Sequence, residues 1–451
     1  MKKLTNTVAI TLFVVAFPVS EAFAAPTAFI NVNVVPMTED RVLSGQTVIV
    51  DDGIITTIGP VDSTPLPGDA DIVDGTDRFL LPGLAEMHAH VPDAGSQDLD
   101  RVLTLFAANG VTTVRGMLGR QSHLQLRAAL LNGDVFGPRL ITSGPSLNGD
   151  SVSGAADGAR QVRSQHAAGY DFLKIHPGLD ADEYTAIADA ANELGIPFAG
   201  HVPVAVGIDN ALAAGMASID HLDGYLAALM PADTDASGGY GGFFDVMLAD
   251  QLLEERIADI ATRTAAAGTW NVPTESLFEH RVSTVSASEL SRRPEMRYMP
   301  QATVQQWVRA KERQENERGF SADLASKAIQ LRRKLIMALH VSGAGLLLGS
   351  DAPQVFNVPG FSLHHELHFL VESGLTPFEA LATGTTAVAE FLGTNTGAVE
   401  VGRDADLILL DANPLIDISN TRRVHGVMLR GRWYSSRELK PRLEAFRVAN
   451  N

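Results

Sequence analysis

The middle of the chain alternates between short apolar runs and longer stretches rich in Ala, Leu and Glu. Such alternation predicts parallel strands joined by crossover helices. The first six runs begin at intervals of about 20 to 33 residues, which is the length of one strand–helix unit. The candidate strands are Leu84–His88, Thr112–Arg115, Arg139–Ser143, Phe172–His176, Phe198–His201, Ser218–His221, Thr269–Pro273 and Leu346–Asp351. Eight such units predict an α/β fold of the (β/α)8 TIM-like barrel type.

The two ends of the chain have a different pattern. Residues 27–80 and 397–434 contain β-branched or alternating runs, separated by turn signals such as Asp52-Gly53. We therefore expect residues 25–82 and 396–451 to form one smaller β-sandwich domain. The barrel domain would then occupy residues 83–395.

The last two strand intervals are much longer than the others, so additional structure is expected there. The stretch 279–335 is polar, is helical in pattern and contains several arginines, including Arg281, Arg293 and Arg313. This predicts a helical insertion in the barrel. Two interpretations remain open, a lid or substrate-recognition element and a solvated helical excursion.

The first residues have the pattern of a secretory signal peptide. A positively charged start, Met1-Lys2-Lys3, precedes an apolar run over residues 8–19, and Ala22-Phe23-Ala24 fits a small-residue cleavage site. The run is short for a membrane span. We therefore expect residues 1–24 to be a signal peptide, and the mature protein to be periplasmic or secreted without stable membrane insertion. A retained membrane anchor is the alternative.

The composition narrows the possible chemistry. The 451 residues include no cysteine and carry a formal net charge of −18. The absence of cysteine excludes disulfides, thiolate zinc sites, iron–sulfur clusters and a cysteine nucleophile. The acidic balance argues against nucleic acid as a partner, because phosphate binding needs concentrated Lys and Arg.

Residues able to bind a metal fall at the carboxyl ends of the predicted strands, where barrel active sites lie. His88 and His90 are two positions apart, so their side chains share one face of a strand. Lys174 lies inside an apolar strand, where a buried ammonium needs a partner. Imidazole and carboxylate ligands suit zinc or a neighbouring divalent metal. The candidate residues are His88, His90, Lys174, His201, His221 and Asp351.

The chain resembles the amidohydrolase superfamily, in its imidazolonepropionase-like branch that includes metal-dependent dipeptidases. The resemblance covers essentially the whole mature chain. One departure is Glu86, two residues before His88, where many relatives carry Asp. The motifs that carry the resemblance are PGLAEMHAH, YDFLKIHPG, PFAGHVP, ASIDHLDG, GSDAP, the closing helix region 364–393 and GAVEVGRDADLILLD.

The resemblance implies a site with two divalent metal ions, zinc being the first choice. His88, His90 and Asp351 would hold the more buried ion, while His201 and His221 would hold the more exposed one. Lys174 would bridge them as a carboxylated lysine. The resemblance also implies attack by a metal-bridging hydroxide, with Asp351 as the proton shuttle.

Further catalytic candidates lie near these residues. His176 follows Lys174 by two positions on the same strand face, and could contact substrate or support a ligand. Tyr225 follows His221 by four positions, and could hydrogen-bond an oxyanion or a substrate carboxylate, with packing at the barrel mouth as the alternative. Arg115 could bind a substrate carboxylate. The sequence His364-His365-Glu366 does not fit the zinc-protease pattern HExxH.

These observations predict an exported amidohydrolase that cleaves the amide bond of a dipeptide, an N-acyl amino acid or a related xenobiotic or toxin amide. The same site would also serve a lactone, an ester or a cyclic amide, and the sequence does not separate these reactions. A binding or scaffold protein that kept the barrel is the non-enzyme alternative. The expected partner is a small-molecule amide or peptide, and a homo-oligomer is compatible with the sequence.

Overall fold

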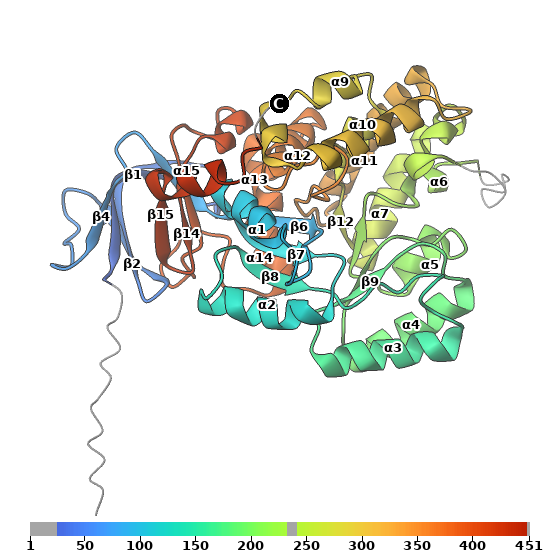
Figure 1. The fold of residues 1–451 in the computed structure, drawn as a ribbon, viewed down its shortest axis with the longest axis horizontal. Helices are drawn as coiled ribbons and strands as arrows, with labels where there is room; N and C mark the ends of the chain where they lie inside the picture. The colour runs from blue at the N-terminus through green and yellow to red at the C-terminus, as the bar shows by residue number, and fades with distance from the viewer. Residues whose placement is uncertain (1–24, 232–240, 449–451) are drawn as a thin grey trace, which may run out of the picture.

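The computed structural model describes residues 25–231 and 241–448. The predicted signal peptide lies outside the described residues. Figure 1 shows a strand-rich part at one end of the molecule and a larger, helix-covered part beside it. Within the described ranges, none of the helices combines the length and the hydrophobicity that a membrane span requires.

The strand-rich part is built from both ends of the chain (Figure 1). Its eight strands pair in the order β15-β14-β13-β5-β1-β2-β3, with β4 also paired to β1. The pairing gives one sheet, where the sequence predicts a sandwich of two. The strands are β1 (Thr27–Val34), β2 (Leu43–Asp51), β3 (Ile54–Pro60), β4 (Asp71–Asp74), β5 (Phe79–Pro82), β13 (Leu407–Leu410), β14 (Val424–Leu429) and β15 (Arg432–Ser435).

One apolar cluster explains why the two ends meet. Phe29, Val48 and Leu80 from the N-terminal strands are buried with Leu407 and Met428 from the C-terminal strands. The sheet joins the ends where β5 pairs antiparallel with β13. Burying these side chains together is favourable because it removes apolar surface from water.

The larger part contains parallel strands in two hydrogen-bonded groups. One has the order β6-β7-β8 and the other β12-β11-β10-β9, and every pairing in them is parallel. Single bridges connect the groups, Ser143 with Phe172 on one side, and Asn271 with Leu346 and Ala89 with Ala352 on the other. The strands are β6 (Leu84–Ala89), β7 (Val111–Gly116), β8 (Arg139–Thr142), β9 (Leu173–Ile175), β10 (Phe198–Gly200), β11 (Ser218–Asp220) and β12 (Trp270–Val272).

Helices follow these strands and cover them. Helix α4, for example, is rich in Ala, starts at a capping box formed by Asp180 and Glu183, and ends at Gly195 in the left-handed conformation. The helices outside the insertion are α1 (Leu99–Ala108), α2 (Gln121–Asn132), α3 (Ala155–Ala168), α4 (Ala181–Leu194), α5 (Gly207–Ala213), α6 (Tyr225–Ala228), η2 (Phe243–Gln251), η3 (Glu254–Arg256), α7 (Ile257–Ala267), α12 (Phe361–Glu372), α13 (Pro377–Thr383), α14 (Thr386–Leu392), η5 (Ile418–Arg422) and α15 (Ser436–Glu444).

The stretch 279–335 is helical, and it has an apolar cluster of its own. Leu290, Met296 and Trp307 are buried together with Val355 and Phe356, which follow Asp351. This packing supports the loop that carries Asp351, so the stretch is more than a solvated excursion. Its elements are α8 (Glu275–Val282), α9 (Ala287–Leu290), η4 (Pro294–Tyr298), α10 (Gln301–Glu315) and the first part of α11 (Ala322–Ser342).

Candidate metal centre

The parallel strands bring the predicted ligands to one edge. His88 lies near the end of β6, Lys174 lies in β9, and His201 and His221 directly follow β10 and β11. Asp351 lies between Leu346, which bridges to β12, and Ala352, which bridges to β6. Because the carboxyl ends of parallel strands meet at the same edge, side chains that are distant in sequence become neighbours there.

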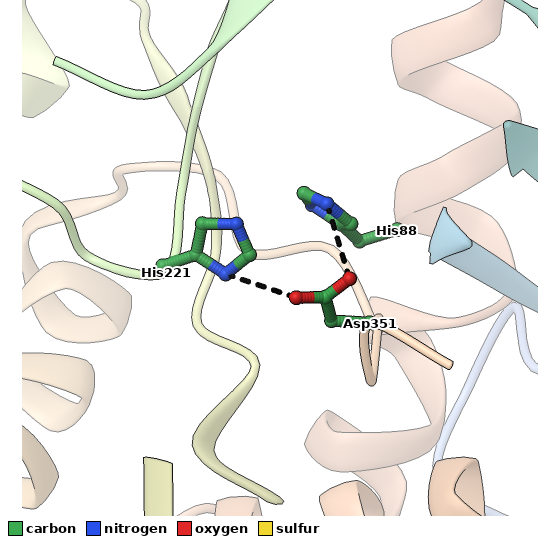
Figure 2. A group of neighbouring side chains, drawn as sticks. All are labelled: His88, His221 and Asp351. Atoms are coloured by element: carbon green, nitrogen blue, oxygen red, sulfur yellow. Dashed lines mark ion pairs between the residues drawn. The ribbon is translucent and has the colours of Figure 1, made fainter. Parts of the chain in front are cut away.

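Three of these residues form the tightest group. One potential ligand atom each from His88, His221 and Asp351 lies within 4.8 Å of the others, and all three side chains are buried. Figure 2 shows each imidazole facing a different oxygen of the Asp351 carboxylate. Asp351 Oδ1 lies 3.5 Å from His88 Nε2, and Oδ2 lies 3.9 Å from His221 Nδ1. His90 joins this group, since its Nε2 atom lies 2.7 Å from Asp351 Oδ1.

Lys174 lies in the same buried region without a hydrogen-bond partner. Its Nζ atom is 3.6 Å from Asp220 Oδ2, and both side chains are fully buried. Burial lowers the pKa of Lys174, against the opposing effect of the carboxylates of Asp220 and Asp351. A side chain at Gly200 would place its Cβ 3.1 Å from Nζ, so this glycine keeps space around the amine.

A row of imidazole rings continues from this group. The ring of His201 lies 4.7 Å from that of His221, and the ring of His176 lies 5.0 Å from that of His201. His201 Nδ1 is 2.9 Å from a carboxylate oxygen of Asp223, and His176 Nδ1 is 2.6 Å from Ser146 Oγ. With Nδ1 engaged in this way, each ring keeps Nε2 for a metal or a substrate.

Asp220 is a functional candidate that the sequence reasoning missed. It is fully buried, and its Oδ2 atom lies 3.1 Å from His88 Nδ1. Burial opposes its ionisation, but the charges of Arg115 and Lys174 outweigh this effect and lower the pKa of Asp220. The available signal was an acidic residue inside the apolar strand that ends at His221.

Two residues predicted to contact the substrate form internal hydrogen bonds. The Tyr225 side chain is fully buried, and its hydroxyl lies 2.6 Å from Asn271 Oδ1 and 3.1 Å from Thr264 Oγ1. Arg115 is buried as well, and it donates to Met87 O and Asp220 Oδ1. Internal hydrogen bonds occupy both side chains, which favours the packing alternative for Tyr225 and a structural role for Arg115.

Glu86 ties two parts of the site together. Its buried carboxylate accepts hydrogen bonds from the backbone N–H groups of His88 and Ser350, at 2.9 and 2.8 Å. Burial raises the pKa of Glu86 to about 8, although the hydrogen bonds from Ser350 and His88 act in the opposite direction. Glu86 therefore fixes the strand of His88 against the segment that precedes Asp351.

Backbone conformation at the site is unusual. His221, Thr274 and Asp351 have φ values of 65°, 48° and 61°, in the left-handed region that non-glycine residues rarely adopt. His221 and Thr274 are linked by a hydrogen bond of 2.8 Å between Nδ1 and Oγ1. Residues held in such conformations are typical of sites where the surrounding structure fixes a side chain for function.

The residues present fit a divalent metal. At this site Lys174 Nζ is buried without a hydrogen-bond partner, and the contacts of His88 Nδ1 with Asp220 Oδ2 (3.1 Å) and of Asp351 Oδ1 with His90 Nε2 (2.7 Å) lie outside hydrogen-bond geometry. Leaving buried polar atoms without partners is costly, and metal ions bound by imidazole and carboxylate groups remove that cost. Imidazole nitrogens and carboxylate oxygens are also the donor set that zinc accepts in sites without cysteine.

A profile of the amidohydrolase family matches residues 79–434. The chain belongs to the amidohydrolase family. This match includes every candidate metal ligand of the protein and reaches the strands of both chain ends.

Solved structures agree with this amidohydrolase fold. A bottromycin amidohydrolase is similar with a TM-score of 0.72 and 24% identity, over 93% of this chain and 90% of that chain. A putative prolidase from Bifidobacterium longum has a TM-score of 0.64 and 22% identity, over 94% and 100% of the two chains. By sequence, a dihydroorotase of Mycobacterium tuberculosis is 37% identical over 73 residues, which is 16% of its length and 16% of this chain.

Proposed function

We propose that this amidohydrolase is an exported, binuclear metal-dependent enzyme that hydrolyses amide bonds in a dipeptide, an N-acyl amino acid or a related xenobiotic or toxin amide. The observation that carries the proposal is the group of His88, His221 and Asp351, which meets at one strand edge around unpartnered buried atoms. Similarity to structures named as a prolidase and a Xaa-Pro dipeptidase supports an amide as the target.

The ligand assignment follows the two halves of the site. His88, His90 and Asp351 would hold one ion, His201 and His221 the other, and zinc suits both sets. The contact of His221 with Asp351, at 3.9 Å, supports two adjoining sets. Lys174 would join them after its amine reacts with carbon dioxide to give a carbamate and a proton. Its unpartnered Nζ atom and the space at Gly200 support this assignment.

The metal ions, when bound, would supply an acidified water molecule and polarise the scissile carbonyl. Asp351 would accept the proton of the attacking water and pass it to the leaving amine. The Nε2 atom of His90 lies 2.7 Å from Asp351 Oδ1, which supports placing both side chains on the same ion. His176, whose ring lies 5.0 Å from that of His201, would contact the substrate. Asp223 and Thr274 hold the rings of His201 and His221 in position.

The proposal includes the architecture and location expected from the sequence. The bridges at Ser143, Asn271 and Ala89 support closure of the parallel strands into a (β/α)8 barrel. The single sheet of the two chain ends would form the second domain. Export to the periplasm or outside the cell rests on the pattern of residues 1–24. The partner would be a small-molecule amide or peptide, with no role for nucleic acid.

Metal analysis and a substrate panel test this function. We expect about two divalent ions per chain, hydrolysis of dipeptides or N-acyl amino acids, and loss of activity with a chelator. Lys174→Ala and Asp351→Asn should both be inactive while remaining folded by circular dichroism. Full activity after chelation, or in both variants, would contradict the mechanism. Faster turnover of lactones than of every amide tested would contradict the choice of bond.

A further inference from the structure

A pocket of about 780 Å³ opens beside His201. Residues from 201–210, 223–228 and 241–248 line it, and we call it the His201 pocket. Its wall is largely apolar, and its volume is within the range of about 300–1,000 Å³ typical of small-molecule sites. The apolar wall includes Val202, Val206, Ile208, Phe243, Phe244 and Leu248.

Phe244 forms the boundary between this pocket and the metal centre. Its ring stacks on the ring of His221 at 5.0 Å and 23°, and on the ring of His201 at 6.2 Å and 15°. Phe244 and Asp245 have φ values of 47° and 61°, so the backbone that presents the aromatic ring is strained. A group that entered the pocket would contact Phe244 and lie next to a predicted metal ligand.

The cations of the pocket already have partners. Arg263 forms ion pairs with Asp209 and Asp259, and Arg256 donates to the backbone carbonyl of Met230. These arginines therefore have little remaining capacity to bind the free carboxylate of a substrate.

The remaining carboxylates also disfavour an anionic ligand. Asp223 accepts hydrogen bonds from His201 and from the backbone of Val202. Asp245 lies near enough to Asp223 for the two charges to repel, and burial and this repulsion raise the pKa of Asp245 to about 6. A further anion placed among these groups would be repelled, whereas a neutral apolar group meets an apolar wall.

We propose that the His201 pocket binds a large apolar group of the substrate, next to the hydrolysed bond, and that Phe244 determines this specificity. The substrate class is thus amides with an aromatic or long aliphatic substituent. This inference rests on the proposed amide hydrolysis and deepens it. The carboxylate end of a dipeptide or N-acyl amino acid would lie outside the pocket.

Two series of dipeptides test the inference with the zinc-loaded enzyme. One series varies the residue on the acyl side and the other varies the residue on the amine side, each with Gly, Leu and Phe. In one of the series we expect kcat/KM to be at least about 10-fold higher for Leu and Phe than for Gly, as for apolar discrimination in other pockets. This ratio reports on the pocket and does not depend on the absolute rate.

Two variants with matched controls locate the effect. Phe244→Ala removes the aromatic wall, and Ala228→Phe places a ring in the pocket lining; each should reduce the Phe-to-Gly ratio by about 10-fold. Phe446→Ala and Ala445→Phe make the same changes at the end of the chain, outside the pocket, and should keep the wild-type ratio. If one pocket variant does not fold, the other variant and the wild-type series still test whether the His201 pocket sets this preference.

The outcomes distinguish the proposed amide hydrolysis from the assignment of the His201 pocket. No hydrolysis of any dipeptide, N-acyl amino acid or other amide would contradict the proposed function itself. Hydrolysis with equal kcat/KM for Gly, Leu and Phe in both series would overturn the pocket assignment and leave the proposed function standing. A wild-type preference that persists in both Phe244→Ala and Ala228→Phe would also overturn it, because another surface would then be responsible.

Discussion

The carboxylate of Asp220 lies 3.1 Å from the Nδ1 atom of His88, and both side chains are buried. A carboxylate in this position selects the tautomer of a metal-binding imidazole and fixes its orientation. We expect Asp220→Asn to weaken zinc binding by about 10- to 100-fold. Competition with a chromophoric chelator measures this affinity.

The exposed residue Asp182, in the first turn of α4, provides a matched control. Asp182→Asn makes the same chemical change away from the metal centre, and its zinc affinity should equal that of the wild type. Equal affinities in the Asp220 and Asp182 variants would show that Asp220 does not support a ligand.

Arg115 is expected to support stability and not to bind substrate. Its guanidinium donates to Asp220 Oδ1 at 3.0 Å in a fully buried pair, so Arg115→Ala leaves a buried carboxylate without its partner. Such changes typically reduce the free energy of unfolding by about 3–5 kcal/mol. Urea denaturation measures this loss. A higher KM with unchanged stability would instead indicate a substrate contact.

Tyr225→Phe distinguishes a structural hydroxyl from an oxyanion donor. The variant removes the donor to Asn271 Oδ1, which is buried, and we expect a loss of about 1 kcal/mol in stability. The value of kcat should change little. If the hydroxyl stabilised an oxyanion, kcat would fall by about 100- to 1,000-fold. Steady-state kinetics beside thermal unfolding decides between the two roles.

Glu366 is expected to make stability depend on pH. Burial raises its pKa from 4.5 to about 7, although hydrogen bonds from Ser276 and Glu275 act against this. Because the folded-state pKa is the higher one, the stabilising contribution is complete below pH 4.5 and is lost as the pH rises through 7.

Glu366→Gln is neutral at every pH and serves as the comparison. Between pH 4.5 and pH 7 the wild type should lose up to about 3 kcal/mol of unfolding free energy that the variant keeps. Urea unfolding of both proteins at pH 5 and pH 8 measures the difference. Parallel pH profiles would mean that Glu366 titrates normally in the folded protein.

The strand ends were the most predictable part of the site. Apolar runs that end in His or Asp predict both a strand and a side chain at its carboxyl end, and His88, His221 and Asp351 do meet there. Asp220 was not predictable in this way. A single acidic residue inside an apolar strand has no periodic partner, and its role depends on Arg115 and Lys174, which come from other strands.

The packing of the Tyr225 side chain has a local cause. A spacing of four residues from His221 places two side chains together only on a continuous helix. Here His221 and Leu222 have φ values of 65° and 52°, and the helix begins only at Tyr225. The two chain ends form a single sheet, where the sequence predicts a sandwich, for another reason. Alternation of apolar and polar residues shows which face of a strand is buried, but it does not show which strand edges pair.

Strands β5 and β13 are neighbours in one sheet, although all the parallel strands lie between them in the sequence. A nascent chain that emerges from the ribosome therefore holds β1 to β5 without their C-terminal partners until synthesis is almost complete. During that time, apolar residues such as Phe29 and Leu80 lack part of their final cover. A chain truncated after residue 395 would keep these apolar residues partly uncovered. The sheet is therefore complete only when the C-terminal strands are added.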